Sequence, residues 1–240
     1  MFIKNNERLI YIQKPSNQYL TQPYIFDLHV QSIMAYTWAT EMCPDTKFIL
    51  KADDDSFVDT FHLPHFLDLY GFNKITNFFL CFVVRNGHPK RNIKNKWYVS
   101  YDEFQGMVYP NYCSGSAYVT RIETMKKILS KIEDLNYLFI DDLMLTGIAA
   151  YGLTTHYDMS STFLESHTDS KEKLLSENTS MYTPQLLAAM DLNSSSILIL
   201  WRKAKACHDN VRCYSLLKTL PEGHMRPKLV PATTFSKIEL

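Results

Sequence analysis

Residues Phe78–Val84 form an unbroken run of apolar side chains, with no polar residue to mark a solvent-facing side. A strand of this composition is typical of a sheet that is covered on both faces. Segments of helical periodicity flank it, for example Ile25–Glu41, where apolar residues recur three or four positions apart. Strands that alternate with helices indicate an α/β fold, with a sheet flanked by helices.

The other expected elements continue this alternation. Short apolar segments indicate further strands, at Arg8–Ile12, Lys47–Lys51, Trp97–Val99 and Ala117–Val119. Helical spacing indicates helices at Phe61–Leu69, at Thr120–Lys131, from Asp141 or Asp142 to Tyr151, and at Ser194–Lys205. Thr120 and Glu123 have the spacing of a capping box. Gly71 and Gly152 are expected to end the helices that precede them.

Length and composition fit one folded domain. With 240 residues, 46% hydrophobic and 21% charged, the chain can bury enough apolar surface to offset its ordering entropy, which excludes general disorder. We expect a single domain over residues 1–220 and a loosely held tail over residues 221–240. The formal charge is zero, so the positive charge expected of a nucleic-acid partner surface is absent. No apolar run approaches the roughly 20 residues that cross a bilayer.

The five cysteines do not have the spacing of a zinc site. No two of them form a Cys-x-x-Cys pair, and they are too few and too scattered for a disulfide-rich miniprotein. Cys207 and Cys213 could pair with each other or with cysteines earlier in the chain. The odd number leaves at least one cysteine without a disulfide partner in the chain.

Three adjacent carboxylates, Asp53, Asp54 and Asp55, directly follow the strand expected at Lys47–Lys51. Adjacent carboxylates repel one another, and a hard divalent cation relieves that repulsion. A bare triplet more often belongs to a solvated turn, because Asp favours turns. Ligands of α/β sheets bind beyond the carboxyl ends of strands, and this position shifts the interpretation towards a metal site.

A second carboxylate pair, Asp141 and Asp142, lies between an apolar segment and an expected helix. A carboxylate there accepts hydrogen bonds from the first backbone N–H groups of the helix, and one Asp is enough for that. The other could serve as a general base held on a rigid element. The residues leave capping and catalysis equally open.

Residues 69–101 contain no acidic side chain but six basic ones, Lys74, Arg85, Lys90, Arg91, Lys94 and Lys96. They could line a phosphate-bearing substrate or form a solvated loop. Lys96 followed by Trp97 pairs a cation with a stacking ring, which suits a nucleotide or a sugar. Tyr109–Gly115 is expected to be a tight loop entering a strand, where Gly115 allows the backbone to approach a ligand closely.

Four segments together resemble the β-1,3-galactosyltransferase and β-1,3-N-acetylglucosaminyltransferase family, glycosyltransferase family 31. They are Phe48–Val58, Lys96–Ser100, Tyr109–Val119 and Ile140–Gly147. Each is weak alone, but their order and spacing are jointly specific, and the resemblance covers roughly Tyr24–Cys213.

The resemblance implies a GT-A fold, in which a nucleotide-sugar-binding sheet is flanked by helices. It implies a Mn²⁺ or Mg²⁺ ion and a UDP-sugar donor, with inverting transfer to a hydroxyl of an acceptor glycan, in β-1,3 linkage during protein glycosylation. Members of the family are usually Golgi membrane proteins with one N-terminal anchor, a segment that this chain does not contain.

The resemblance also implies roles for particular residues. Asp55 would bind the metal, and Asp142 would take the proton from the acceptor hydroxyl. Asp53 and Asp54 would contact the ribose and support the metal site. The donor and acceptor pocket would be completed by Lys96, Trp97, Tyr112 and Gly115.

Two departures from the family pattern motivate alternatives. The first strand–helix unit of the family is expected to be missing, and Met190 stands where many relatives have a His that is a candidate metal ligand. His156 or His167 could substitute for it. A catalytically inactive relative that binds a glycan or a partner is therefore the alternative function. A metal-dependent phosphohydrolase is a third, which leaves Lys96 and Trp97 without a role.

Overall fold

The structure is a computed structural model that describes residues 2–3, 9–14, 22–159, 162–164, 175, 186–210 and 227–231. Its centre is a seven-stranded sheet with the strand order β1-β2-β3-β6-β5-β7-β10. The strands are β1 (Phe2–Ile3), β2 (Leu9–Lys14), β3 (Phe48–Asp53), β5 (Phe78–Val84), β6 (Tyr112–Arg121), β7 (Thr155–Asp158) and β10 (Lys228–Val230). β2 runs parallel to β3 and β5 runs parallel to β7, whereas β6 is antiparallel to both of its neighbours. The sheet is therefore mixed.

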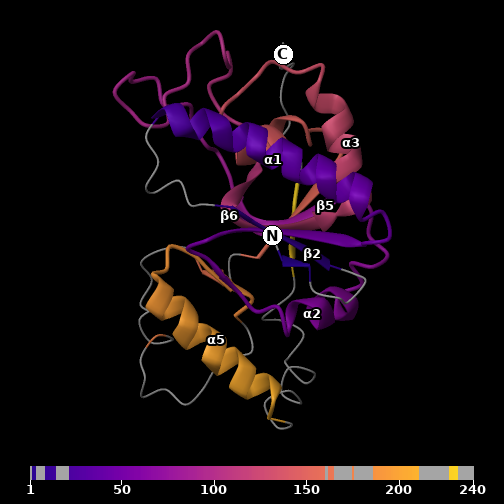
Figure 1. The fold of residues 1–240 in the computed structure, drawn as a ribbon. Coiled ribbons are helices and arrows are strands. Elements are labelled where there is room, and N and C mark those ends of the chain that lie inside the picture. The colour runs from indigo at the N-terminus through magenta and orange to yellow at the C-terminus, as the bar shows by residue number, and fades with distance from the viewer. Residues whose placement is uncertain are drawn as a thin grey trace.

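Helices cover both faces of this sheet (Figure 1). Over one face lie α1 (Gln22–Met42) and α3 (Ile122–Ile132), while α2 (Leu63–Leu69) and α5 (Ser194–His208) lie on the opposite side. The expected α/β fold is confirmed, and the arrangement is compatible with a GT-A-like fold. A parallel β2–α1–β3 unit leads into the acidic triplet, and the expected loss of the first strand–helix unit of the family stays a prediction.

Strand β5 is buried from both sides, as its apolar run predicts. Phe78 and Leu80 pack in the same apolar cluster as the buried face of α2. Phe79 and Cys81 face the other way, into the cluster that contains the buried faces of α1 and α3. Alternate side chains of one strand thus anchor the helices of both layers.

A second, three-stranded sheet has the order β4-β9-β8 and lies beside α5. Its strands are β4 (Phe57–Val58), β9 (Ala188–Ala189) and β8 (Phe163–Leu164). α5 begins at Ser194, as expected, but its cap is Asn193, whose side-chain oxygen accepts a hydrogen bond from the N–H of Ser196 at 2.8 Å. The two sheets are joined through β3, because the turn after β3 leads directly into β4.

One expected strand and one expected helix cap are wrong. Trp97–Val99 is not a strand, and Tyr98 forms an isolated bridge to Lys90 within an irregular loop. Thr120 does not cap a helix, because it still belongs to β6, and its hydroxyl donates to the Phe78 carbonyl at 2.6 Å. The helix begins two residues later, with no side-chain cap.

The helix expected from Asp141 or Asp142 to Tyr151 is shorter and of another type. One helical turn at residues 141–142 continues as the π-helix η2 (Leu143–Ile148). π-Helical turns are rare and are frequent at functional sites. Gly71 follows α2 with a positive φ angle of 73°, as expected of a glycine that ends a helix. Gly152 also has a positive φ angle, 70°, but η2 already ends at Ile148, so this glycine lies in the turn beyond the helix.

The cysteines are used in different ways. Cys81 and Cys113 form a disulfide between β5 and β6, which the sequence did not indicate. Cys207 is also disulfide-bonded, and Cys43 has no disulfide partner, which confirms that one cysteine stays free.

The described residues include part of the expected tail. β10 pairs antiparallel with β7, so residues 228–230 add an edge strand to the main sheet. Most of the tail, and most of residues 160–184, lie outside the described residues, so the domain boundary at residue 220 stays a prediction. Among the helices that are described, none combines the length and apolar character needed to cross a membrane.

Candidate active site

A pocket of about 440 Å³ lies where the ends of β3, β6 and η2 meet an irregular loop. It gathers every residue that the sequence singled out for the site except Asp54. These are Asp53, Asp55, Lys96, Trp97, Tyr112, Gly115 and Asp142. Segments that are far apart in sequence therefore contribute to one cavity, although their individual roles stay predictions.

The acidic triplet is divided between a strand and a turn. Asp53 is the last residue of β3 and is buried, whereas Asp54 and Asp55 form the turn that follows. Asp55 lines the pocket, and its carbonyl accepts a hydrogen bond from the N–H of Leu192 at 2.8 Å. Asp54 is exposed and does not line the pocket, so the structure does not bring it together with the other predicted residues.

Asp53 has a counter-charge inside the protein. The ammonium of Lys51 is 2.6 Å from its Oδ1, and the Lys51 side chain is 2% exposed. Lys51 and Asp53 are two positions apart on β3 and so project to the same face of the strand. The sequence did not single out Lys51, although a charged residue within a strand of buried residues is a usable signal.

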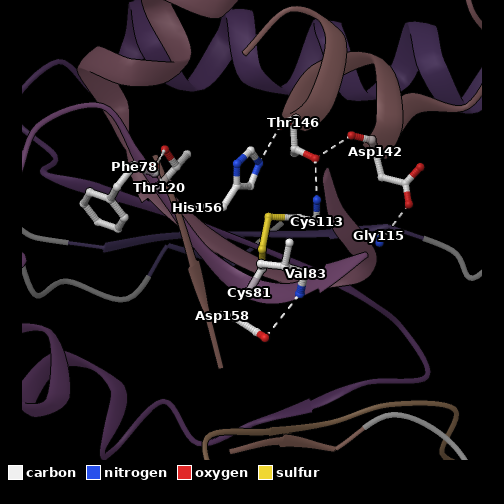
Figure 2. Close-up of a disulfide and its surroundings, with 10 residues drawn as sticks. All are labelled: Phe78, Cys81, Val83, Cys113, Gly115, Thr120, Asp142, Thr146, His156 and Asp158. Atoms are coloured by element: carbon white, nitrogen blue, oxygen red, sulfur yellow. Dashed lines mark hydrogen bonds between the residues drawn. A yellow bond between two sulfur atoms is a disulfide. The ribbon is translucent and has the colours of Figure 1, made fainter. Parts of the chain in front are cut away.

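Asp142 is held by two backbone N–H groups. Its Oδ1 accepts from the N–H of Leu143 at 2.8 Å, and its Oδ2 accepts from the N–H of Gly115 at 2.9 Å (Figure 2). Asp141 points elsewhere, and its carboxylate accepts a hydrogen bond from the Ser32 hydroxyl of α1 at 2.9 Å. Of the two carboxylates, Asp142 therefore both caps η2 and lines the pocket.

Gly115 is needed at its position because Asp142 lies very close. A Cβ atom added to Gly115 would lie 3.0 Å from Oδ2 of Asp142 and 3.3 Å from its Cβ. The sequence predicted that the backbone approaches a ligand closely at this glycine, which stays a prediction, and the close neighbour in the structure is the side chain of Asp142. A side chain here would push the carboxylate out of its present place.

Thr146 fastens η2 to the sheet beside Asp142 (Figure 2). Its hydroxyl donates to the carbonyl of Asp142 at 2.6 Å and accepts from the N–H of Cys113 at 2.8 Å. The carbonyl of Thr146 is 2.8 Å from Nε2 of His156, which donates to it. Burial keeps the pKa of His156 below its ordinary value of 6.5, and the bond to Thr146 opposes that shift. The imidazole is thus kept neutral behind the site.

His156 does not fit as a substitute for the missing metal-binding His. His156 is engaged with Thr146 and does not line the pocket. Met190 is fully buried in the core cluster beside α2, and His167 lies outside the described residues. The pocket instead receives the next residue, Asp191, which has a positive φ of 53°. In the sequence, the only signal for Asp191 was that it directly follows Met190.

The basic loop contributes Lys90, Lys96 and Trp97 to the pocket, together with His88, which the sequence did not single out. The Lys96 ammonium lies 5.0 Å from the centre of the Trp97 ring, so the cation and the ring are neighbours in the pocket. Trp97 also stacks on Phe139, with ring centres 6.4 Å apart. An aromatic face beside a cation can receive a sugar or a base and its phosphate.

Two of the basic residues, Arg85 and Arg91, make structural contacts instead. The guanidinium of Arg91 donates to the carbonyls of Val99, Ser100, Phe104 and Gly106. Arg85 pairs with Asp158 of β7. Lys90 and Lys96 line the pocket, whereas these two arginines hold the loop and the strand edge, and a role of the lysines in binding phosphate stays a prediction.

Tyr109 is a further pocket residue that the sequence did not assign. It is 4% exposed, and among the described residues its hydroxyl has no hydrogen-bond partner. Burial raises the pKa of Tyr109 to about 12, so the phenol stays protonated. Its position in the tight loop predicted at Tyr109–Gly115 was the available signal.

The chemistry of the pocket fits a hard divalent cation whose remaining coordination positions would be filled by a substrate. Within the described ranges, no group of three or more His, Cys, Asp or Glu side chains is placed to hold a metal alone. Mg²⁺ and similar ions commonly take one or two carboxylates, with phosphate oxygens and water filling the remaining positions. Asp55 and Asp191 offer such oxygens in one pocket, and the hydrogen bond from Leu192 to Asp55 joins their segments.

Comparison with known proteins identifies the family of this chain. The galactosyltransferase family model matches residues 20–160, more than half of the chain. The human lactosylceramide 1,3-N-acetyl-β-D-glucosaminyltransferase is 32% identical over 138 residues, which cover 56% of this chain and 36% of that protein. The mouse β-1,3-galactosyltransferase 2 is 31% identical over 138 residues, covering 55% and 33%. The match thus spans about a third of these relatives. All four motif segments contribute residues to one pocket. The family model matches more than half of the chain, so the chain belongs to the galactosyltransferase family.

Proposed function

We propose that this pocket is the active site of an inverting, metal-dependent hexosyltransferase. It would move a sugar from a UDP-sugar to a hydroxyl of an acceptor glycan, in β-1,3 linkage. The observation that carries the proposal is the placement of Asp142, whose two oxygens are fixed by backbone N–H groups in the pocket that Asp55 also lines. The relatives named above, one an N-acetylglucosaminyltransferase and one a galactosyltransferase, support the reaction class.

The reaction needs one displacement. The acceptor oxygen attacks the anomeric carbon while the bond from that carbon to the UDP oxygen breaks, and the bonding electrons leave with UDP. The hydroxyl proton passes to Asp142, which acts as general base. Because inversion needs no covalent intermediate, no nucleophilic side chain is required, as in inverting glycosidases.

Other pocket residues bind and orient the substrates. A bound Mn²⁺ or Mg²⁺ would supply Lewis-acid stabilisation of the leaving diphosphate, and Asp55 with Asp191 would hold it. Asp53, paired with Lys51, presents a fixed carboxylate towards the nucleotide. Lys96 and Trp97 offer charge and a stacking face. Tyr112 and Gly115 shape the wall next to Asp142.

The same proposal includes the cellular setting. The resemblance to Golgi enzymes supports a lumenal catalytic domain attached to the Golgi membrane through an N-terminal anchor. The disulfide between Cys81 and Cys113 supports an oxidising compartment, because such bonds persist in the secretory pathway and are rare in the cytosol.

The test combines transfer and binding. Purified protein is incubated with Mn²⁺, a panel of UDP-sugars and glycan acceptors, and product is measured by mass spectrometry. In Asp142→Asn, transfer should fall about 10²- to 10⁴-fold, the usual contribution of a general base, while calorimetry still detects UDP binding. Asp134→Asn, an exposed carboxylate away from the pocket, is the matched control. Undiminished transfer in Asp142→Asn contradicts the base assignment, and UDP binding without any transfer by the unmodified chain favours a binding protein.

A further inference from the structure

Lys51 is a buried cation with partners on two strands that border the pocket. Its side chain is 2% exposed, and its ammonium donates to Oδ1 of Asp53 on β3 and to the carbonyl of Gly115 on β6. A buried charge is costly unless it is paired and hydrogen-bonded. Both of its partners line the pocket, whereas Lys51 itself does not.

Gly115 is held from two sides. Lys51 donates to its carbonyl, and its own N–H donates to Oδ2 of Asp142. The two peptide groups on either side of its Cα are therefore tied, one to the core of the sheet and one to the start of η2. The lack of a Cβ lets Asp142 come close enough for this arrangement.

We propose that Lys51 is a positioning residue, whose hydrogen bond to the Gly115 carbonyl aligns the Gly115 N–H that fixes Asp142. The proposal rests on the proposed function, in which Asp142 receives the proton. It differs from a role for Lys51 as mere counter-charge to Asp53, because it runs through Gly115. A displacement of about 1 Å in a reacting group can cost on the order of 10²-fold in rate, so loss of this support should appear in kcat.

The kinetic test separates these routes. In Lys51→Met, kcat should fall about 10- to 100-fold, whereas the KM for the UDP-sugar changes less than about threefold. In an Asp53→Asn background, Lys51→Met should still lower kcat by a similar factor. No further loss in that background would show that Lys51 acts only on Asp53 and would overturn the proposal. Lys126→Met, an exposed lysine on α3, is the control.

A second background separates positioning from general damage. In Asp142→Asn, the group to be positioned has lost its basic charge, so adding Lys51→Met should change the residual transfer less than about twofold. A purely structural role predicts the same 10- to 100-fold loss there as in the unmodified chain, which would contradict the proposal. If Lys51→Met does not fold, the double variant Lys51→Met/Asp53→Asn is used, because it removes both buried ions together. Its kcat is then compared with that of Asp53→Asn alone.

A spectroscopic test does not depend on activity. Ser114-Gly115 is the one Ser-Gly pair in the sequence, so labelling with carbonyl-¹³C serine and ¹⁵N glycine isolates a single amide signal. We expect Lys51→Met to shift this signal and to accelerate its hydrogen exchange at least about tenfold. The ¹⁵N signals of Gly71 and Gly152, in turns away from the pocket, should not move.

The outcomes distinguish the two proposals. If the unmodified chain transfers no sugar from any donor, the proposed function fails, but the Gly115 signal still decides whether Lys51 holds this peptide. If transfer is active and the Gly115 signal is unchanged in Lys51→Met, the positioning role is wrong and the proposed function stands. A changed Gly115 signal together with an unchanged kcat also overturns the positioning role.

Discussion

The pocket joins two groups of residues that the chain supports in contrasting ways. The acidic set consists of Asp53, Asp55, Asp142 and Asp191, and the loop set consists of His88, Lys90, Lys96 and Trp97. Asp53 ends β3 and Asp142 begins η2, so both are fixed by regular structure and by buried partners. The loop set lies in a segment without strand or helix, apart from the bridge between Lys90 and Tyr98.

The difference lies in what fixes each set. Lys51 donates a hydrogen bond to the Asp53 carboxylate, and Gly115 and Thr146 donate to Asp142, so these two members of the acidic set are held by the sheet and by η2. The loop is held in large part by Arg91, whose guanidinium binds four carbonyls within residues 99–106. Groups that take part in bond making need fixed positions, whereas groups that bind a substrate can sit on a more adaptable loop. We therefore expect the acidic set to govern rate and the loop set to govern binding.

The largest expected effect is within the acidic triplet itself. Asp55→Asn should lower transfer about 10³-fold and abolish the increase in UDP affinity on adding Mn²⁺, because it removes a charged oxygen ligand. Asp54→Asn should lower transfer less than about tenfold, because Asp54 is exposed and outside the pocket. Initial rates and calorimetric titrations with and without Mn²⁺ measure both effects. Equal losses in the two variants would contradict the placement of Asp54.

The next largest effect is expected from removing the disulfide between β5 and β6. Replacing Cys81 and Cys113 by alanine should lower the free energy of unfolding by about 3–4 kcal/mol, as for a crosslink that closes a loop of 32 residues. Urea unfolding measures the stability, and Cys43→Ser, which breaks no disulfide, is the control. A larger loss for Cys43→Ser would be inconsistent with this view.

The same contrast explains how much could be predicted from the sequence. The strand Phe78–Val84 and the residues at strand ends could be predicted, because apolar runs and the turn after a strand are local features. The strand expected at Trp97–Val99 was wrong, because its backbone is organised by Arg91 from outside the segment. The capping box at Thr120 failed because pairing between β5 and β6 continues through that residue.

The residues that were missed depend on contacts between distant segments. Lys51 gains its role from Gly115, which is 64 positions away. Asp191 reaches the pocket because the N–H of Leu192 binds the Asp55 carbonyl. Periodicity and local motifs carry no information on such pairings. The choice between Asp141 and Asp142 likewise required the positions of Ser32 and Gly115.

For the loop set, the expected effect is smaller and falls on binding. Lys96→Met should raise the KM for the UDP-sugar about three- to tenfold and leave kcat within about twofold, because it removes a partly exposed positive charge from the pocket in which we propose that the donor phosphates bind. The increase should shrink at high salt, because salt screens exposed charges. Lys94→Met, an exposed lysine of the same loop outside the pocket, is the control. A loss confined to kcat would contradict the division between the two sets.

The smallest expected effect concerns pH and the support of the acidic set by His156. Burial holds the pKa of His156 in the folded protein below 6.5. As the pH falls below about 6.5, the unfolded chain binds a proton that the folded protein does not, so acidification destabilises the fold. This one group contributes a slope of at most about 1.4 kcal/mol per pH unit.

His156→Gln keeps a donor for the Thr146 carbonyl and removes the titration. Its free energy of unfolding, measured by urea from pH 7.5 to 5.5, should therefore fall less steeply than that of the unmodified protein. Equal slopes for the two proteins would show that His156 titrates in the folded state as it does in the unfolded chain.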